Sequence, residues 1–380
     1  MPPADRLTCA SRSSGRRSVL RRALRVGLSF AALLGVTSAA LIGYAYAKYD
    51  GQIHRIDVLQ TKDPSIRKPE AQAHATNFLI IGSDSRQGAN SGYGHVAGER
   101  SDTTILIHLA PNHRRATVIS IPRDSWVEIP RCIGTDGKPV AAHHELFNSA
   151  FSIGGARCTV ATVQKLTGIA VTHYLQIDFA GFKKVVNALG TVTICSPEPV
   201  YDQNTKLRLH KGNNTLDGSD ALRYVRAREE IGDGSDLGRI KRQQQFLGVV
   251  LRQAMRGTLL NNPSRLTGFL DATTKSITAD DHTSFGDLRN LASSLHGLNP
   301  KRVVFYTAPI ADQDYAPPGY SGGKVLLDAR KGAVLYGSII NDTTTVSSTS
   351  KPPTPTPTNT TGTTTAPRPN ANAGDKTCRL

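Results

Sequence analysis

Residues 77–86 read NFLIIGSDSR, an apolar run that passes directly into small and charged residues. The aliphatic residues up to Ile81 and the turn former Gly82 predict a buried β-strand that ends at this point. Two further runs, 103–109 and 117–121, have the same character and are also expected to be strands. Charged residues flank all three runs. Because α/β folds usually place their sites at strand ends, the sequence predicts a sheet with a charged site at its edge.

Helical segments alternate with these strands. The clearest is 236–255, where Ile240, Leu247 and Leu251 belong to an apolar stripe at helical spacing. Further helices are expected at 158–166, 179–189, 264–275, 284–296 and 328–340, and further strands at 174–177 and 302–306. Strands interleaved with helices predict an α/β layered domain with a mostly buried sheet.

The N-terminal region is basic and then apolar. Residues 1–25 contain seven arginines and one acidic residue, Asp5, whereas residues 26–47 carry no charge. At about 1.5 Å per residue this run is long enough to cross a bilayer of about 30 Å. Arginines before the run predict a cytoplasmic N-terminus, with everything after Lys48 outside. A cleaved signal peptide is the alternative, because 45–47 resembles a cleavage site, but the length of the run favours an uncleaved anchor.

The chain has 380 residues and a formal net charge of +16, of which residues 1–25 contribute +6 and the rest +10. This excess favours anionic partners such as acidic lipids, phosphates, anionic polymers or nucleic acid. We expect no nucleic-acid partner, because no recognised binding motif is present and the domain is expected to be exported. The sequence also lacks a Walker P-loop, a dinucleotide-binding GxGxxG and a GxSxG elbow.

Polar segments bound the expected folded domain, which we place at 76–341. Residues 48–75 have the composition of a juxtamembrane linker. Residues 342–380 are rich in threonine and proline, which predicts a disordered tail.

The five cysteines are Cys9, Cys132, Cys158, Cys195 and Cys378. Cys9 precedes the apolar run and is expected in the cytoplasm, and Cys378 lies in the tail. Among the other three we expect one disulfide and one odd thiol. Cys132 with Cys158 is the chosen pair because these residues bracket a short polar insertion, although sequence alone does not fix connectivity.

Four charged clusters lie at the ends of predicted elements. They are Asp84 with Arg86, Arg100 with Asp102, Arg123 with Asp124, and Arg226 and Arg228 with the helix residues Asp236, Arg239, Arg242, Gln243 and Gln244. On the helix, Asp236, Arg239 and Gln243 share one face, away from the apolar stripe. A single Asp/Arg pair is more often an ion pair or a turn cap, but four at comparable positions favour a shared site.

These residue types suit phosphate chemistry. Paired aspartates can hold a hard divalent cation such as Mg²⁺, which often shares its oxygen ligands with substrate phosphates. Arginines add bidentate contacts to phosphate oxygens and stay charged. Together they suit pyrophosphate chemistry, in which charge must be neutralised on both phosphates. The residues alone predict only a phosphate-binding site.

Taken in order, these motifs resemble those of the LytR-CpsA-Psr family of cell-wall glycopolymer ligases. The matching segments are 77–86, 100–103, 120–124, 224–228 and 236–244. The resemblance implies a three-layer α/β/α domain around a mixed sheet, carried on one N-terminal anchor outside the cytoplasmic membrane. It also implies a phosphotransferase that moves a glycopolymer to peptidoglycan. The glycopolymer would be teichoic acid or another wall polymer, carried by a polyprenyl-pyrophosphate lipid in the membrane.

The resemblance also implies roles for individual residues. Asp84 and Asp102 would bind Mg²⁺ or Mn²⁺. Arg86, Arg100, Arg239 and Gln243 would bind the pyrophosphate, and Arg123, Asp124, Arg226 and Arg228 would act in catalysis, with Asp124 orienting or deprotonating the acceptor hydroxyl. Residues 87–98 form a longer loop than is typical here. Two other functions stay open: a polyprenyl-pyrophosphate pyrophosphatase, and a non-catalytic binder or regulator of anionic wall polymers.

Overall fold

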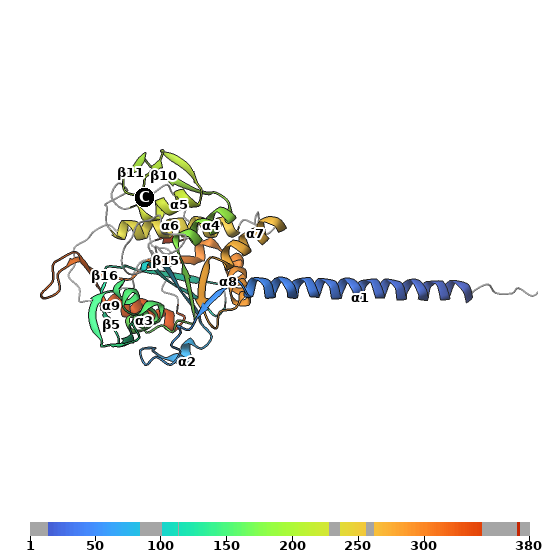
Figure 1. Ribbon diagram of the computed structural model, residues 1–380, viewed down its shortest axis with the longest axis horizontal. Helices are drawn as coiled ribbons and strands as arrows, with labels where there is room; N and C mark the ends of the chain where they lie inside the picture. The colour runs from blue at the N-terminus through green and yellow to red at the C-terminus, as the bar shows by residue number, and fades with distance from the viewer. Residues whose placement is uncertain are drawn as a thin grey trace, which may run out of the picture. The chain divides into compact units, whose positions relative to one another are not determined.

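The computed structural model describes residues 14–83, 101–112, 114–227, 236–255, 262–343 and 371–372. The chain divides into two units, Met1–Gly51 and Gln52–Leu380. In the first unit the described residues form α1, Ser14–Asp50 (Figure 1). Its stretch Arg25–Asp50 is long and apolar enough to cross a membrane, by length and composition, and it contains the predicted span 26–47.

The second unit is built on an eight-stranded mixed sheet. Its strand order is β1 (His54–Ile56), β14 (Ile277–Asp280), β9 (His173–Ile177), β2 (Thr76–Ser83), β3 (Ser101–Leu109), β4 (Ala116–Ile121), β15 (Val303–Thr307) and β18 (Ala371–Asn372). The central strand β3 is antiparallel to β2 and β4, whereas β2 pairs in parallel with β9, and β4 with β15. The strands predicted from apolar runs are therefore the centre of this sheet.

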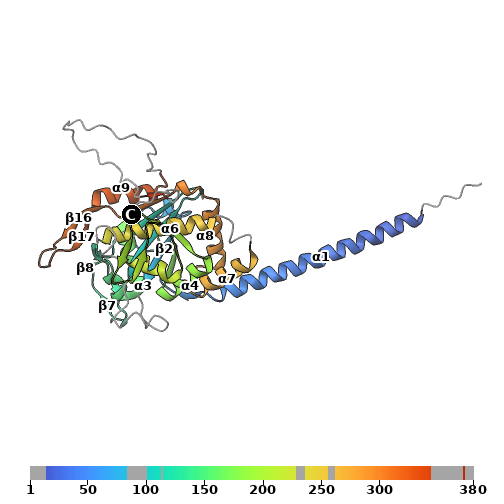
Figure 2. The ribbon, with the colours of Figure 1, turned by 90° about the horizontal axis from the view of Figure 1, so that it is seen from above.

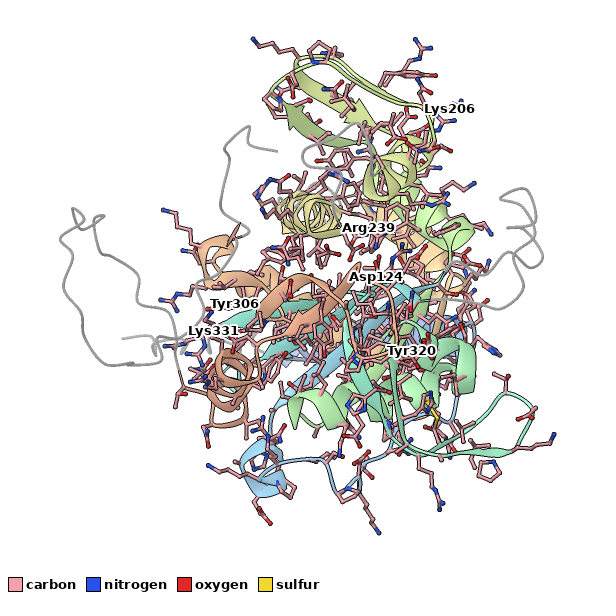
Figure 3. The ribbon with its side chains drawn as sticks, turned by 90° about the vertical axis from the view of Figure 1, so that its left-hand side faces the viewer. Asp124, Lys206, Arg239, Tyr306, Tyr320 and Lys331 are labelled. Carbon is pink, nitrogen blue, oxygen red and sulfur yellow. A yellow bond between two sulfur atoms is a disulfide. The ribbon has the colours of Figure 1, made fainter. Side chains whose placement is uncertain are left out.

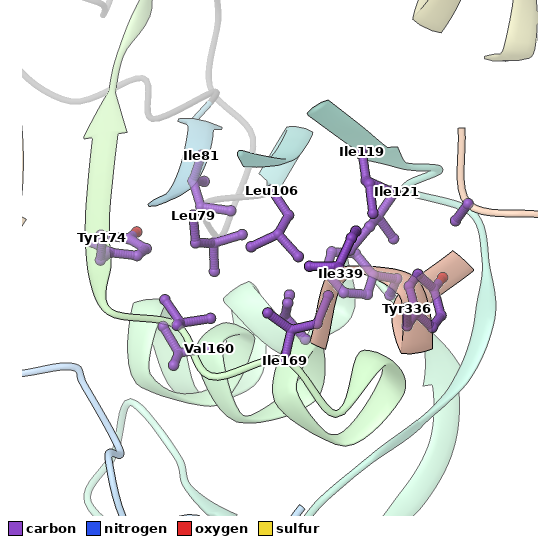
Figure 4. Packing of buried hydrophobic residues seen from close by; sticks show 14 of the residues in the cluster. Leu79, Ile81, Leu106, Ile119, Ile121, Val160, Ile169, Tyr174, Tyr336 and Ile339 are labelled. Carbon is purple, nitrogen blue, oxygen red and sulfur yellow. The ribbon is translucent and has the colours of Figure 1, made fainter. Parts of the chain in front are cut away.

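Helices cover both faces of the sheet. On one face lie α3 (Ser149–Thr167) and α9 (Ala329–Ile340), which pack on Leu79, Leu106 and Ile119 (Figure 4). On the other face lie α6 (Asp236–Met255) and α8 (Phe285–Gly297), which pack on Ile105 and Val118. Figure 2 shows α6 and α8 from above. The predicted three-layer α/β/α architecture is confirmed, because neighbouring residues of each strand alternate between the two cores.

A smaller core lies beyond α6. It is formed by α4 (Phe179–Leu189), α5 (Gly218–Arg226), the pair β10 (Val192–Ser196) and β13 (Gly212–Leu216), and the pair β11 (Val200–Asp202) and β12 (Leu207–Leu209). Phe246 of α6 packs with Tyr224 of α5 in this core, whereas Leu247 and Leu251 of α6 face the large sheet. Helix α6 is therefore buried from two sides.

The remaining elements complete the second unit. They are α2 (Pro69–Gln72), α7 (Pro263–Thr274), the 3₁₀ turn η2 (Pro300–Arg302), and the strand pairs β5 (Trp126–Ile129) with β8 (His143–Leu146), β6 (Cys132–Ile133) with β7 (Pro139–Val140), and β16 (Ile310–Tyr315) with β17 (Lys324–Leu327). The expected disulfide Cys132–Cys158 is confirmed, with Cα atoms 5.5 Å apart. Cys195 is disulfide-bonded as well, so the expectation of one odd thiol is wrong.

The structure extends three of the expected elements. The helix predicted at 158–166 begins nine residues earlier, at Ser149, because non-helical dihedrals at Gly154 and Gly155 interrupt its periodicity. The supposed linker 48–75 contains β1, which pairs in parallel with β14, so the folded unit begins before residue 76. Residues 371–372 of the Thr/Pro-rich tail pair with the edge strand β15. Strands this short give no detectable period in sequence.

Candidate functional site

The guanidinium of Arg123 lies among three carboxylates that come from three segments of the chain. Its Nη1 donates to Oδ1 of Asp102 at 2.7 Å, and Asp102 is the second residue of β3. Its Nε lies 3.5 Å from Oδ2 of Asp124 and 3.7 Å from Oδ1 of Asp236, the first residue of α6. One cation therefore joins the end of β4, the start of β3 and the N-terminus of α6.

Backbone hydrogen bonds fix the loop that carries Arg123 and Asp124. The carbonyl oxygen of Arg123 accepts from Asn148 N at 3.0 Å, and that of Asp124 accepts from Val325 N at 2.9 Å. The carbonyl oxygen of Ser125 accepts from Phe147 N at 2.8 Å. The loop is thus held on one side by the segment before α3 and on the other by β17. Such support pre-organises charged side chains for binding.

One face of α6 completes the site. Arg239 donates through Nη2 to Oδ1 of Asp236, and Gln243 donates through Nε2 to Oγ1 of Thr103 at 3.0 Å. The predicted common face of Asp236, Arg239 and Gln243 is confirmed, and Figure 3 shows Arg239 and Asp124 near one another between α6 and the sheet. The face is less open than expected, because the side chain of Arg239 is only 6% exposed. This face of α6 packs against the start of β3 and the loop that follows β4.

Two neighbouring residues of α6 hold the helix in place. Gln244 donates to Oγ of Ser120 at 2.9 Å and to the carbonyl oxygen of Tyr306 at 3.0 Å. Arg242 donates to the carbonyl oxygen of Ala227, which follows α5. Both side chains are buried. They therefore act on the position of the site through α6, and not by facing a ligand.

The electrostatics of the site favour a charged Arg123. Burial opposes its charge, but the nearby carboxylates Asp124, Asp102 and Asp236 outweigh that cost and raise the pKa of Arg123. Among the described residues the site holds three carboxylates against the guanidiniums of Arg123 and Arg239, a formal charge of −1. The side chains of Asp102 and Asp124 are about one quarter exposed, at 25% and 24%. A ligand can therefore reach both.

Arg226 is the last residue of α5, beside the part of α5 that Gln243 contacts. The carbonyl oxygen of its neighbour Val225 accepts from Nε2 of Gln243 at 3.3 Å, which joins the helix end to the site. The guanidinium of Arg226 itself lies over the ring of Phe179, 4.3 Å from the ring centroid. This cation–π contact orients the arginine.

The structure therefore brings together five of the predicted site residues: Asp102, Arg123, Asp124, Arg239 and Gln243. Arg226 is joined to them through the α5 backbone. The predictions for Asp84, Arg86, Arg100 and Arg228 lie outside the described residues, as does the long loop 87–98. Ser83, the last residue of β2, pairs with Ser101, the first residue of β3. The end of β2 therefore lies beside Asp102.

Two contributors were not assigned a role from the sequence. Asp236 was recognised on the shared helix face, and its helical spacing from Arg239 was the signal that could have placed it in the site. Phe179 gave no signal, because a phenylalanine at a helix start is ordinarily a core residue and Arg226 is distant in sequence.

Asp102, Asp124 and Asp236 supply only oxygen donors, which are the ligands that a hard cation such as Mg²⁺ prefers. Among the described residues, however, no group of three or more His, Cys, Asp or Glu side chains is arranged as a metal centre. In this arrangement the guanidinium of Arg123 lies where the three carboxylates converge. The described donors suit a divalent cation in their chemistry, but in this arrangement Arg123 holds them together.

The second unit is thus an α/β/α domain with a site of arginines and aspartates at the ends of its central strands. Residues 44–325 match the LytR_cpsA_psr family. The chain belongs to that family, and the resemblance inferred from its motifs is confirmed.

Curated relatives support the same assignment. The chain is 32% identical over 270 residues to the probable cell wall biosynthesis protein LcpB of Corynebacterium glutamicum, covering 69% of this chain and 59% of that protein. It is 31% identical over 259 residues to the polyisoprenyl-teichoic acid–peptidoglycan teichoic acid transferase TagU of Halalkalibacterium halodurans, covering 65% and 77%. The matches span 59% and 52% of the two Corynebacterium relatives, LcpB and LcpA, so just over half of their length.

Solved structures share the fold. A LytR-Csp2A-Psr enzyme from Actinomyces oris matches with a TM-score of 0.56 at 22% identity and covers 76% of this chain and 95% of that one. TagT bound to LI-WTA matches with a TM-score of 0.54 at 25% identity and covers 76% and 98%. The first likeness establishes the fold alone.

Proposed function

We propose that this protein is a phosphotransferase that moves a wall glycopolymer, teichoic acid or another, from a polyprenyl-pyrophosphate carrier to peptidoglycan. The observation that carries the proposal is the Arg123 guanidinium, held charged among Asp102, Asp124 and Asp236 at the ends of the central strands. The family membership and the TagU relative support it.

Arg123 and Arg239 would bind the donor pyrophosphate. Each guanidinium can make two parallel hydrogen bonds to phosphate oxygens, and neither loses its charge at any working pH. Since both now bond to carboxylates, a phosphate must share or displace those partners. A divalent cation, Mg²⁺ or Mn²⁺, bound by Asp102 together with Asp84, would neutralise the negative charge that otherwise repels the donor.

Asp124 would orient the acceptor hydroxyl and take its proton. The hydroxyl oxygen forms a bond to the sugar-linked phosphorus, and the bond from that phosphorus to the bridging oxygen breaks. The bridging oxygen leaves with polyprenyl phosphate, and the product is a phosphodiester between glycopolymer and peptidoglycan. Positioning and charge neutralisation are the main sources of rate in such a transfer.

The apolar part of α1 would anchor the enzyme beside its lipid-linked donor. Arginines that precede Val26 favour a cytoplasmic N-terminus, and the second unit would then lie outside the membrane. An anchored enzyme and a lipid-linked substrate both diffuse in the plane of the membrane, so they meet by a search in two dimensions and not in three.

A transfer assay on the full-length chain in detergent tests the proposal. A lipid-pyrophosphate-linked saccharide is supplied with peptidoglycan fragments, with and without Mg²⁺, and both polyprenyl phosphate and the glycopolymer–peptidoglycan product are measured. We expect both products to form together, only with acceptor present. Polyprenyl phosphate released equally well without acceptor would instead identify a pyrophosphatase, and donor binding without turnover would identify a binder or regulator.

Arg226 and Arg228 offer a matched pair of variants. Replacing either with alanine is expected to abolish transfer while the protein still folds. The control is Arg223→Ala, on the same helix α5, because Arg223 is exposed and pairs with Asp220 outside the site. Full transfer activity in both Arg226→Ala and Arg228→Ala would contradict these two assignments.

A further inference from the structure

A large cleft opens on the α3 side of the sheet. Its volume is about 1020 Å³, and its walls come from β5, β8, the C-terminal end of α3, β17 and the start of α9. This volume is at the upper end of the roughly 300–1,000 Å³ that small-molecule sites occupy. None of the described charged-site residues Asp102, Arg123, Asp124, Asp236 or Arg239 lines it. The cleft is therefore distinct from the charged site in its lining residues.

Aromatic rings form one wall of the cleft. Trp126 and Tyr315 line it from β5 and β16. The indole of Trp126 also packs against Tyr320, with ring centroids 4.9 Å apart and the planes tilted by 56°. Tyr320 is 57% exposed and lies in the turn between β16 and β17 (Figure 3). A braced, half-buried aromatic ring offers a flat apolar surface with a polar edge to a ligand.

The charged groups of the cleft balance one another. Arg67 and Lys165 supply two positive charges, and Glu128 and Asp328 supply two negative charges. Lys165 Nζ lies 3.3 Å from Oε1 of Glu128, and Arg67 Nη2 donates to the carbonyl oxygen of Thr167 at 2.6 Å. With no surplus of positive charge, the cleft is not built to select a phosphate. With so many polar groups, it is not built to hold a polyprenyl chain either.

A neutral saccharide fits this lining. A sugar ring has an apolar face that can lie on an aromatic ring, and hydroxyl groups at its rim that can bond to charged and amide groups. A cleft of this size holds more than one such ring.

The cleft and the charged site are built on adjoining residues of the same chain segments. Trp126 follows Asp124 by two residues, and two residues of extended chain span at most about 7 Å. The carbonyl oxygen of Asp124 accepts from Val325 N, and Val325 belongs to β17, which also lines the cleft through Leu326 and Leu327. A glycan lying on Trp126 would therefore end close to Asp124.

We propose that this cleft binds the acceptor glycan, a neutral amino-sugar oligosaccharide of the peptidoglycan type, through stacking on Trp126 and Tyr315 and hydrogen bonds to Lys165 and Glu128. This assignment rests on the proposed function, because it places the acceptor beside Asp124 and opposite the donor pyrophosphate. The donor's own saccharide has the same general chemistry, so the test must separate the two.

Trp126 is the only tryptophan in the chain, so its fluorescence reports on the cleft alone. The full-length protein in detergent is titrated with peptidoglycan disaccharide and tetrasaccharide fragments, with the free donor saccharide, and with inorganic pyrophosphate. We expect a saturable change in tryptophan emission with the peptidoglycan fragments only. An equal response to the donor saccharide, or no response to the fragments, would overturn the proposal.

Two variants test the lining without removing the probe. Tyr315→Ala and Lys165→Ala are each expected to weaken fragment binding at least fivefold, while Tyr315→Phe keeps the stacking surface and most of the affinity. Tyr201→Ala is the control, because Tyr201 is exposed on β11, does not line the cleft and lies against the side chain of Arg208. Unchanged affinity in both Tyr315→Ala and Lys165→Ala would contradict the assignment.

The two proposals can fail separately. A protein that transfers glycopolymer but shows no tryptophan response to the fragments keeps its proposed function and loses the acceptor cleft. A protein that binds the fragments through the cleft but forms no phosphodiester loses the proposed function, and the cleft is then a wall-glycan binding site only.

Discussion

The charged site around Arg123 and the cleft around Trp126 lie three residues apart in the chain and differ in almost every property. The charged site holds guanidinium and carboxylate groups in direct contact, with a formal charge of −1 among the described residues. The cleft holds aromatic rings and charges that cancel. Under the two proposals above, one loop would supply a surface for phosphate and a surface for sugar, which is what an enzyme joining a phosphate to a sugar hydroxyl requires.

The loop of residues 123–125 can contribute to both the charged site and the cleft because hydrogen bonds hold its backbone in place. Hydrogen bonds from Asn148, Phe147 and Val325 hold the three carbonyl groups from Arg123 to Ser125. The loop carries Arg123 toward α6, and β5 then carries Trp126 toward α3. The difference between the two regions is therefore set by side chains on a common rigid support, so substitutions in one should leave the other intact.

Among the described residues of the charged site, the largest effect is expected at Arg123. Arg123→Ala removes the cation that binds the donor and leaves three carboxylates facing one another, so we expect transfer to fall more than about 100-fold. Arg123→Lys keeps the charge but not the bidentate geometry, and it should recover only a small part of the activity. The response of Trp126 to peptidoglycan fragments should stay within about twofold of wild type. Wild-type transfer rates in Arg123→Ala would show that the donor binds elsewhere.

Asp124 should show a different kind of loss. Asp124→Asn keeps the size of the side chain but cannot accept the hydroxyl proton, so kcat should fall by about 100-fold, within the range for loss of a general base. The apparent KM for the lipid-linked donor should hardly change, because Arg123 and Arg239 remain. Steady-state kinetics at varied donor concentration separate the two constants. A rise in donor KM with unchanged kcat would place Asp124 among the donor-binding groups instead.

The disulfide Cys132–Cys158 should affect the stability of the fold and not the transfer reaction. It closes a separation of 26 residues between β6 and α3. Removing such a link by the double change Cys132→Ser and Cys158→Ser is expected to lower the free energy of unfolding by about 3.5 kcal/mol on the chain-entropy estimate. Urea unfolding of both proteins measures the difference. Equal stabilities would mean that α3 packing alone fixes β6.

His108 should give the stability of the second unit a dependence on pH. Burial lowers the pKa of His108 from 6.5 to about 4, although Asp342 partly opposes the shift. The unfolded chain therefore binds the proton more strongly, and stability is lost as pH falls from about 6.5 towards 4, by about 3 kcal/mol at pH 4. Arg123 keeps its charge throughout. Unfolding free energies measured from pH 7 to 4 should fall less steeply in His108→Gln, and an identical slope would assign the effect to other groups.

The elements with strong hydrophobic periodicity could be predicted closely from the sequence. The helices α4 and α6 have the predicted bounds, and the strands β2, β3 and β4 contain the predicted runs. Helix α5 and the strand pairs of the smaller core were not predicted. They are short and polar on one side, and their burial depends on α6, which no local pattern reveals.

The charged site was predicted in part, because its residues follow one another in recognisable motifs. Asp102, Arg123 and Arg239 could be named from sequence, but the contact of Arg226 with Phe179 could not. The cleft was not predicted at all. Its lining residues Arg67, Trp126 and Tyr315 come from distant parts of the chain and share no motif, so only the fold brings them together.

The most direct test of the proposed function is to identify the bond that the enzyme makes. Lipid-pyrophosphate-linked saccharide and peptidoglycan fragments are incubated with the wild-type chain, Arg123→Ala or Arg223→Ala, and the products are analysed by mass spectrometry. We predict a phosphodiester between saccharide and peptidoglycan, with one polyprenyl phosphate released per bond, in the wild type and Arg223→Ala but not in Arg123→Ala. Polyprenyl phosphate released without that bond, or the same bond formed at wild-type yield by Arg123→Ala, would contradict it.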